Sequence, residues 1–202
     1  MSVTKQGETK AGDVSAQGSA LDGLIERAGK LRGPAPVHLW NPADCGVIDI
    51  RIDRQGGWHH EGRPILREAL VRLFATVLRR EPDGSYVLVT PAEKLTIAVE
   101  DVPFIAVEMA IEGEGDARKL ILRTNVGDLV VVDAAHPLRI APGAARDGLV
   151  PYVRVRGGLE ARLARPLVHE LAPHFEQRGE EIGLVSSGHF FVIGRAEAVV
   201  TL

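Results

Sequence analysis

The chain of 202 residues has a single cysteine, Cys45, so no disulfide can form within it and nothing indicates an oxidising compartment. It lacks an apolar run of the ~20 residues that a membrane-spanning helix needs. Its first 18 residues are polar and small, without the apolar stretch of a signal peptide. We therefore expect a cytoplasmic protein with no membrane partner.

An excess of positive charge is also missing. The 24 Lys and Arg residues are outnumbered by 27 Asp and Glu residues, and the formal net charge is −3. Proteins whose main partner is nucleic acid usually carry a basic surface. The composition therefore gives no reason to expect nucleic acid as the main partner.

Recognisable metal-binding and catalytic motifs are absent as well. His59 and His60 are adjacent on an expected strand and so point to opposite faces, and no histidine has a zinc-ligand spacing with Cys45. Ser186-Ser187-Gly188-His189 has no G-x-S-x-G elbow, and Gly113-Glu114-Gly115 joins two expected strands rather than a strand and a helix. The sequence therefore predicts no metal and no cofactor.

What the sequence does contain is strand-like alternation and one clear amphipathic helix. The apolar residues of Val47–Ile52 alternate with charged ones, and Trp58–His60 follows a Gly-Gly turn as the partner strand of a hairpin. The segment Leu66–Leu78 has an apolar stripe with helical spacing, in which Leu73 and Phe74 are central. Both side chains are predicted to be buried.

From Tyr86 onwards, short turns separate successive expected strands. Connections this short require antiparallel neighbours, because a parallel crossover needs a dozen residues or more. After the expected strand Pro151–Arg156, the segment Leu159–Leu171 is predicted to be a helix that is interrupted near Pro166. The predicted fold class is α+β, with mainly antiparallel sheets and a few helices.

The predicted domain organisation starts with a disordered tail at residues 1–18, which have little to bury. A faint repeat then matches the spacing of one set of apolar residues to a second set: Val87, Val89, Leu95 and Ile97 to Val130, Val132, Leu138 and Ile140. Alternating strands also produce such matches by chance, so duplication is one of two interpretations. A boundary near Asp101 would give an N-terminal α+β domain at 19–100 and a C-terminal β-rich domain with a helix at 101–202.

Six stretches of the sequence carry a resemblance to a known family. They are Ile50–Ile52 through Trp58 and Gly62, Leu88–Lys94, Glu100–Phe104, Thr124–Gly127, His136–Leu138 and Pro151–Ala161. Together they resemble a bacterial family catalogued as domain of unknown function 1285. The resemblance implies two related domains, the second loosely like a pleckstrin-homology fold, with a site between them for a nucleotide-like ligand in a signalling role. It implies no enzymatic activity.

The expected strand, Gly-Gly pair and helix after residue 150 form the best local candidate for a ligand site. Arg154 and Arg156 are two residues apart and so project to the same strand face, with Tyr152 beside them. Gly157 and Gly158 would let a ligand approach the backbone, and the helix start would offer free N–H groups. This set fits a phosphate or carboxylate, with Tyr152 available to stack on a base. The alternative is an exposed face on which the arginines pair with local acids.

The opposite wall of the expected cleft is assigned to Trp58, Arg67, Thr90, Glu93 and Lys94. The turn that contains the last three offers a hydroxyl, a carboxylate and an ammonium group close together. Thr and Glu in such a turn more often satisfy backbone donors. For Trp58, the alternative is a tryptophan packed in the core.

These residues lead to a predicted ligand-binding or sensory module for a small anionic, nucleotide-like ligand at the cleft between two domains. The first alternative is a protein-interaction module, which docks a protein partner on its sheet faces or edges and takes no small ligand. The second is a hydrolase that uses acid–base groups such as His60 and Glu93, and it is less favoured. A concave pocket separates the ligand module and the hydrolase from the protein-interaction module, because both of the former need one whereas a docking surface can be flat.

The histidine spacing leads to a prediction about metal content. Purified protein is expected to carry no stoichiometric zinc or iron, because no group of side chains has the spacing of a ligand set. Elemental analysis of the purified chain checks this. About one metal ion per chain that is lost on replacement of His60 would contradict it.

Overall fold

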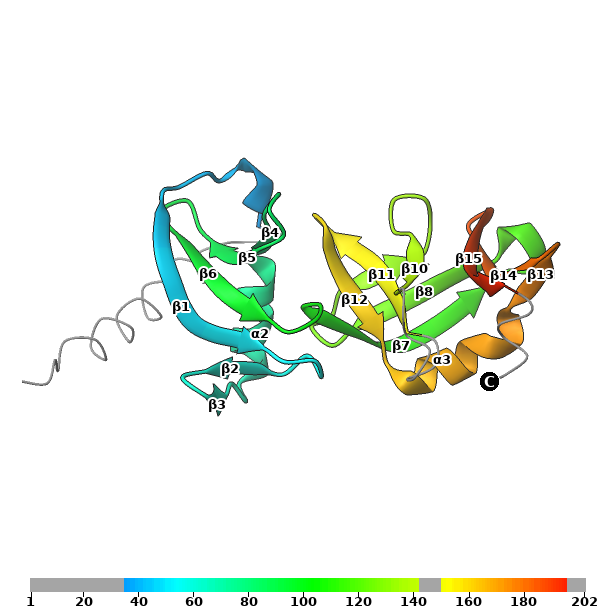
Figure 1. Cartoon of the computed structure of the whole chain (residues 1–202), viewed down its shortest axis with the longest axis horizontal. Helices are drawn as coiled ribbons and strands as arrows, with labels where there is room; N and C mark the ends of the chain where they lie inside the picture. Colours follow the sequence, from blue (N-terminus) through cyan, green and yellow to red (C-terminus); the bar gives the residue numbers. More distant parts are fainter. Residues whose placement is uncertain (1–34, 142–149, 196–202) are drawn as a thin grey trace, which may run out of the picture.

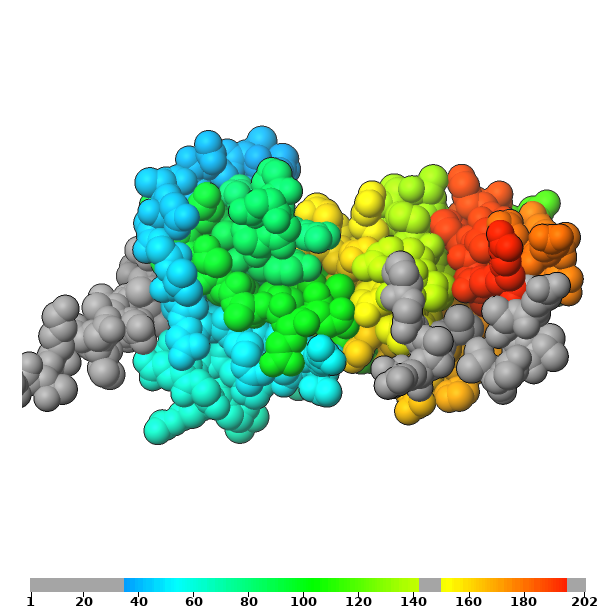
Figure 2. All heavy atoms as spheres, in the orientation of Figure 1, coloured from blue at the N-terminus to red at the C-terminus, as the bar shows by residue number. Residues whose placement is uncertain are grey.

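The computed structural model describes residues 35–141 and 150–195. These residues form two sheet-rich domains side by side, with a small third sheet at the far end of the second domain (Figure 1). The two domains pack against each other in the middle of the molecule (Figure 2). The predicted tail at 1–18 and the residues up to 34 lie outside the described residues.

The first domain is built on a six-stranded sheet. Its strands are β1 (Asp44–Ile52), β2 (Trp58–His60), β3 (Arg63–Pro64), β4 (Leu78–Arg80), β5 (Tyr86–Val89) and β6 (Lys94–Val99). The spatial order is β3-β2-β1-β6-β5-β4, in which the central pair β1 and β6 is parallel and the other neighbours are antiparallel. A short helix, η1 (Val37–Leu39), precedes the sheet, and α2 (Glu68–Thr76) lies between β3 and β4 in the chain.

The second domain has a six-stranded sheet of its own. Its strands are β7 (Phe104–Glu112), β8 (Lys119–Thr124), β9 (Leu129–Val131), β10 (Leu138–Ile140), β11 (Pro151–Arg156) and β12 (Leu159–Leu163). The spatial order is β10-β11-β12-β7-β8-β9, again with a parallel central pair, here β7 and β12. The short helix η2 (Gly115–Ala117) joins β7 to β8, and α3 (Arg165–Leu171) with η4 (Ala172–His174) follows β12.

The two sheets have the same strand order. Numbered within its own domain, each sheet runs third, second, first, sixth, fifth, fourth strand. In this arrangement β5 and β6 correspond to β11 and β12, whereas the repeat read from the sequence matched them to the segment of β9 and β10. That match was wrong, because a period of two lets any alternating strand fit any other.

A third sheet closes the second domain at its far end. It consists of β13 (Glu176–Arg178), β14 (Glu181–Ser186) and β15 (His189–Arg195), all antiparallel. The buried Ser186 joins it to the second domain: its Oγ donates to the Val132 carbonyl oxygen at 2.7 Å and accepts from the Leu120 backbone N–H at 2.9 Å. Ser186 therefore connects the third sheet to β8 and to the residue after β9, at one edge of the larger sheet.

Two sequence-based expectations about helices are corrected. The predicted helix Leu66–Leu78 is shorter, because α2 covers only Glu68–Thr76, while Leu66 stays 85% exposed before it and Leu78 belongs to β4. The predicted helix Leu159–Leu171 begins as β12, whose residues are alternately buried and half-buried. Pairing with β7 fixes this segment as a strand, and the helix α3 starts only after it.

The α+β class is confirmed, and so is the hairpin in which Ile52 pairs with Trp58. The two six-stranded sheets are mixed rather than purely antiparallel, because each has its parallel pair at the centre. The likeness of the second domain to a pleckstrin-homology fold stays a prediction. No helix within the described residues is long and apolar enough to cross a membrane.

The core of the first domain lies between α2 and its sheet. Phe74, at 0% exposure, stacks on Trp58, at 2%, with 6.0 Å between the ring centroids. Leu73, its neighbour on the predicted apolar stripe, is only half-buried and packs at the margin of the core. Burial of an aromatic side chain of this size stabilises a domain by several kcal/mol.

Replacement of Phe74 should therefore have a large effect on stability. Phe74→Ala is expected to destabilise the protein by about 3–5 kcal/mol through lost burial and the cavity that is left. Leu66→Ala, at an exposed leucine, serves as the control and should change the free energy of unfolding by less than about 0.5 kcal/mol. Chemical denaturation of both variants measures the difference, and equal midpoints would contradict the assigned core.

Candidate functional site

The predicted arginine face exists on β11, but its residues have different surroundings. Val153 and Val155 point into the core, so Tyr152, Arg154 and Arg156 share the other face. The side chain of Arg154 is exposed and has no hydrogen bond, ion pair or ring contact with any described residue. Shared direction on the strand therefore does not bring the three side chains to one ligand position.

Tyr152 is held within the second domain rather than presented to a ligand. It is 7% exposed, and its hydroxyl donates to the carboxylate of Asp101 at 3.2 Å. The guanidinium of Arg139 covers the ring at 4.4 Å from its centroid, and this same guanidinium makes a bidentate pair with Glu160. Burial raises the pKa of Tyr152, and the neighbouring Asp101 carboxylate raises it further. The ring face that a base would need is occupied.

Arg156 lies between the two domains. Its Nη2 donates to the Ala75 carbonyl oxygen at 2.7 Å, at the C-terminal end of α2 in the first domain. Its Nη1 bonds the carboxylate of Asp128, and its guanidinium lies 4.9 Å from the centroid of the Phe104 ring in the second domain. A cation at the end of a helix binds carbonyls that have no partner within the helix. Arg156 therefore connects the first domain to the second.

Gly157 and Gly158 form the tight turn between β11 and β12. Both have positive φ, +49° and +78°, which is the left-handed region that glycine adopts without strain. The expected helix start after Gly158 is not present, because Leu159 begins β12. No helical N–H groups are therefore available there for an anion.

The five residues assigned to the opposite wall are scattered over the first domain. Trp58 is packed on the core, and Arg67 is exposed at the start of α2. Thr90 is fully buried, and its Oγ accepts from the backbone N–H groups of Ala92 and Glu93, so it closes its own turn. The Lys94 ammonium lies 3.7 Å from a carboxylate oxygen of Glu81. None of the five lines the cavity described next.

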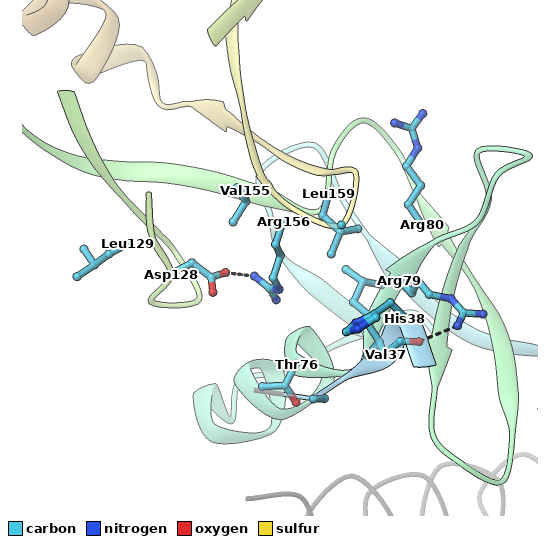
Figure 3. A pocket seen from close by; sticks show the side chains of 13 residues that line it. Val37, His38, Thr76, Arg79, Arg80, Asp128, Leu129, Val155, Arg156 and Leu159 are labelled. Carbon is cyan, nitrogen blue, oxygen red and sulfur yellow. Dashed lines mark hydrogen bonds and ion pairs between the residues drawn. The ribbon is translucent and has the colours of Figure 1, made fainter. Parts of the chain in front are cut away.

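A cavity of about 720 Å³ lies between the two domains. The first domain supplies η1, the end of α2 and β4, and the second supplies the start of β9 and the β11–β12 turn (Figure 3). The lining residues are Ala35, Val37, His38, Thr76, Leu78, Arg79, Arg80, Asp128, Leu129, Val155, Arg156, Gly157 and Leu159. Of the ten residues predicted from the sequence, the structure brings only Arg156 and Gly157 to this cavity.

The cavity lining has more positively than negatively charged side chains. Three arginines line it against one aspartate, and that aspartate is paired with Arg156. Arg79 is also engaged: its Nη1 donates to the backbone carbonyls of Val37 and Trp40 at 2.8 and 2.5 Å, and its Nε bonds Glu81. Arg80 has no carboxylate within ion-pair distance among the described residues. Its nearest described ring is that of Tyr86, 5.8 Å away.

Sequence reasoning missed Arg80 and His38 as site residues. The consecutive arginines before the turn at Pro82 were visible, but the apolar stripe runs on through Leu78 and made this segment look helical. As the strand β4, it instead turns Arg80 towards the β11–β12 turn, where a Cβ on Gly158 would lie 4.0 Å from the arginine Cδ. Nothing in the sequence around His38 indicates that it reaches the same cavity.

Acid–base and metal chemistry find little support among the described residues. No group of three or more His, Cys, Asp or Glu side chains comes together there. The Nε2 of His60 is buried without a hydrogen-bond partner, so no second polar group positions it as a base. His59 does bond Asp53 at 2.8 Å. Burial would raise the pKa of Asp53, but hydrogen bonds from His59, Gly57 and Gln55 outweigh it and lower the pKa.

The position of Arg156 between the domains leads to a prediction about stability. Arg156→Ala should destabilise the protein by about 1–2 kcal/mol, because the α2 carbonyl and Asp128 both lose a charged partner at a partly exposed site. Arg154→Ala is the matched control on the same strand and should change stability by less than about 0.5 kcal/mol. Thermal and urea denaturation compare the two, and a larger effect at Arg154 would contradict the assignment.

Comparisons with known proteins agree with this two-domain architecture. The profile described as "Domain of unknown function (DUF1285), N-terminal domain" matches residues 35–102, and that described as "Protein of unknown function (DUF1285), C-terminal domain" matches residues 103–193.

The crystal structure of a DUF1285 family protein from Silicibacter pomeroyi DSS-3 is similar at 43% identity and a TM-score of 0.82, covering 88% of this chain and 97% of that one. A DUF1285 family protein from Shewanella baltica OS155 is similar at 25% identity and a TM-score of 0.52, covering 64% and 94%. No curated protein matches the chain. The chain belongs to the DUF1285 family.

Proposed function

We propose that this protein is a binding module that takes a small anionic ligand in the cavity between its two domains. The observation that carries the proposal is the charge of the cavity lining, in which Arg80 remains unpaired among the described residues after Arg79 pairs with Glu81 and Arg156 with Asp128. The volume of about 720 Å³ falls within the range of small-molecule sites, roughly 300–1,000 Å³. An unbalanced positive charge in a concave site attracts and retains anions.

Arg80 is the arginine of the lining whose charge is left unpaired among the described residues, and in Figure 3 its guanidinium extends outward beside the β11–β12 turn. Its guanidinium has no acid to neutralise it among the described residues, whereas Arg79 and Arg156 already bond carboxylates. A guanidinium presents several N–H donors in one plane and so suits a carboxylate or a phosphate. Arg156 contributes from the other domain, so an anion held between them would contact both domains at once.

Contact with both domains is what a sensory role requires. A ligand shifts a conformational equilibrium only by its differential affinity for the two states. A ligand between Arg80 and Arg156 would favour the arrangement in which the two domains are close. The corresponding role in the cell would be cytoplasmic signalling, and it depends on ligand binding being measured first.

A second candidate function, a protein-interaction module, is favoured by the edge strand β9. Leu129 and Val131 are 72% and 37% exposed, and β9 pairs only with β8 among the described strands. An exposed apolar edge can add an extended peptide as a further strand. Binding of a peptide to this edge would not need Arg80, so the same experiment separates the two candidates.

The anion proposal is tested by thermal-shift screening followed by calorimetry. Inorganic phosphate, phosphorylated metabolites, nucleotides and short-chain carboxylates are the probes, since binding to the native state raises the melting temperature. An anion that binds in the cavity should lose roughly tenfold or more in affinity on Arg80→Ala, because a charge-assisted hydrogen bond contributes about 1.5–3 kcal/mol.

Arg154→Ala is the control for this experiment. It removes the same charge from an exposed position outside the cavity, so the affinity should stay within about twofold of the original protein. A loss on Arg154→Ala equal to that on Arg80→Ala would restore the site first predicted on β11. Absence of any anion that depends on Arg80 would favour the protein-interaction module.

A further inference from the structure

Four arginines and two tyrosines gather where one sheet face of the second domain meets the first domain. We call this group the basic seam: Arg80 and Tyr86 from the first domain, and Arg139, Tyr152, Arg154 and Arg162 from the second. The acids that contact the group are Asp101 and Glu160. The whole chain has a formal net charge of −3, so four cations beside two anions give this surface the opposite sign.

Strand pairing places the members from the second domain on one face. Tyr152 of β11 is opposite Arg139 of β10 and also opposite Arg162 of β12. Arg154 of β11 is opposite Glu160 of β12. Residues directly opposite each other in neighbouring strands point to the same side of a sheet. These side chains therefore project together from β10, β11 and β12, on the side away from the core.

Tyr86 continues the group into the first domain. Burial raises the pKa of Tyr86, the guanidinium groups of Arg80 and Arg139 oppose this rise, and the carboxylates of Glu160 and Asp101 add to it. Such effects weaken with distance, so these four charges lie around the Tyr86 ring. The Arg80 guanidinium is 5.8 Å from the ring centroid and extends outward beside the β11–β12 turn (Figure 3). Both domains therefore contribute to one surface.

The arginines of the basic seam are accessible, and one of them is already fixed in position. Arg139 lies on the ring of Tyr152 and makes its bidentate pair with Glu160, yet its side chain stays 46% exposed. Arg80 and Arg154 are exposed, and neither has a carboxylate within ion-pair distance among the described residues. A side chain that is ordered before binding loses less conformational entropy when a partner arrives.

From this surface we infer that the protein binds an acidic segment of a protein partner across its two domains. Arginine and tyrosine are enriched in protein interfaces and lysine is depleted, and all four cations of the basic seam are arginines. Clusters of arginine recognise acidic motifs through charge-assisted hydrogen bonds. The two unpaired cations, Arg80 and Arg154, belong to different domains, which suits an extended segment with several carboxylates better than one compact ion.

The inference goes beyond the proposed function, because it concerns a different surface. Of the residues in the basic seam, only Arg80 lines the cavity. Arg139 and Arg154 lie outside it, so an acidic segment can bind whether or not a small anion occupies the cavity. A variant of Arg154 therefore separates the two sites.

The distribution of charge favours a protein over a nucleic acid. A nucleic acid binds mainly through phosphates along its backbone and needs a wide basic surface. Arg139 is paired with Glu160, and Arg162 lies 3.8 Å from a carboxylate oxygen of Asp101. The excess positive charge is thus confined to two positions, which match carboxylates at intervals in a peptide rather than a continuous run of phosphates.

Fluorescence anisotropy with the full chain tests the inference. The probe is a short fluorescein-labelled peptide in which Glu and Asp alternate with Ser, and the matched peptide has Gln and Asn at the acidic positions. The acidic peptide is expected to bind roughly tenfold or more tightly than its neutral counterpart, because each carboxylate makes a charge-assisted bond. Equal affinities, or no binding of the acidic peptide, would overturn the inference.

Two charge-reversal variants locate the binding. Arg154→Glu should weaken the acidic peptide roughly tenfold or more, since an attraction becomes a repulsion. Arg63→Glu is the matched control, at an exposed strand residue on the opposite edge of the first sheet from β4, and should stay within about twofold. Arg154 is exposed, so the melting temperature of its variant should be unchanged. Equal losses in the two variants would mean non-specific attraction and would overturn the inference.

A labelled oligouridylate of the same charge as the acidic peptide is the last probe. Weaker binding of the oligonucleotide than of the peptide supports the inference. Tighter binding of the oligonucleotide that is also lost on Arg154→Glu would assign the basic seam to nucleic acid and overturn it.

Discussion

The Arg156 guanidinium makes the contact on which the relation between the two domains depends. It leaves the sheet of the second domain, bonds Asp128 beside it and reaches the last turn of α2 in the first domain. The β1–β2 turn makes a second connection, where Gly56 lies against Asn125: a Cβ there would come within 2.8 Å of the amide nitrogen. The side-chain oxygen of Asn125 accepts the Ile105 N–H at 3.0 Å, and its nitrogen donates to the Gly56 carbonyl at 3.3 Å. Both connections join the first domain to the second, and the cavity lies beside the first of them.

The interface combines these polar fixed points with apolar contacts, because Leu78 of the first domain and Val155 and Leu159 of the second are all buried around the cavity. Arg162 adds a bond to the Arg54 carbonyl and lies 3.8 Å from Asp101, in the short connection between the domains. Hydrogen bonds of this kind exchange with water at a small net change in free energy.

Local pattern in the sequence was sufficient for the elements whose residues determine their own structure. The β1–β2 hairpin follows from the alternation of Ile48, Ile50 and Ile52 and from the Gly-Gly turn after it. The segment of β12 was not predictable in this way, because Leu, Glu, Ala and Arg are all strong helix formers and only its pairing with β7 makes it a strand. In the candidate site, too, some features follow from local sequence pattern and others from contacts between distant segments. The common face of Tyr152, Arg154 and Arg156 follows from a period of two, but the contact of Arg156 with α2, the cover of Arg139 on Tyr152 and the approach of Arg80 join segments far apart in the chain. Residue spacing along the chain cannot predict contacts between segments that far apart in sequence.

The parallel pair at the centre of each sheet has a consequence for how the chain reaches its structure. In both domains this pair joins the first strand to the last, β1 to β6 and β7 to β12. The middle of each sheet therefore cannot form until the whole domain has left the ribosome, and a chain cut before β6 leaves β1 with one open edge. Contacts between segments so distant in sequence close large loops and slow the search for the native state. During synthesis, β1 and then β7 lack their central partners until β6 and β12 have been made, so the apolar half of each strand stays unpaired for that time.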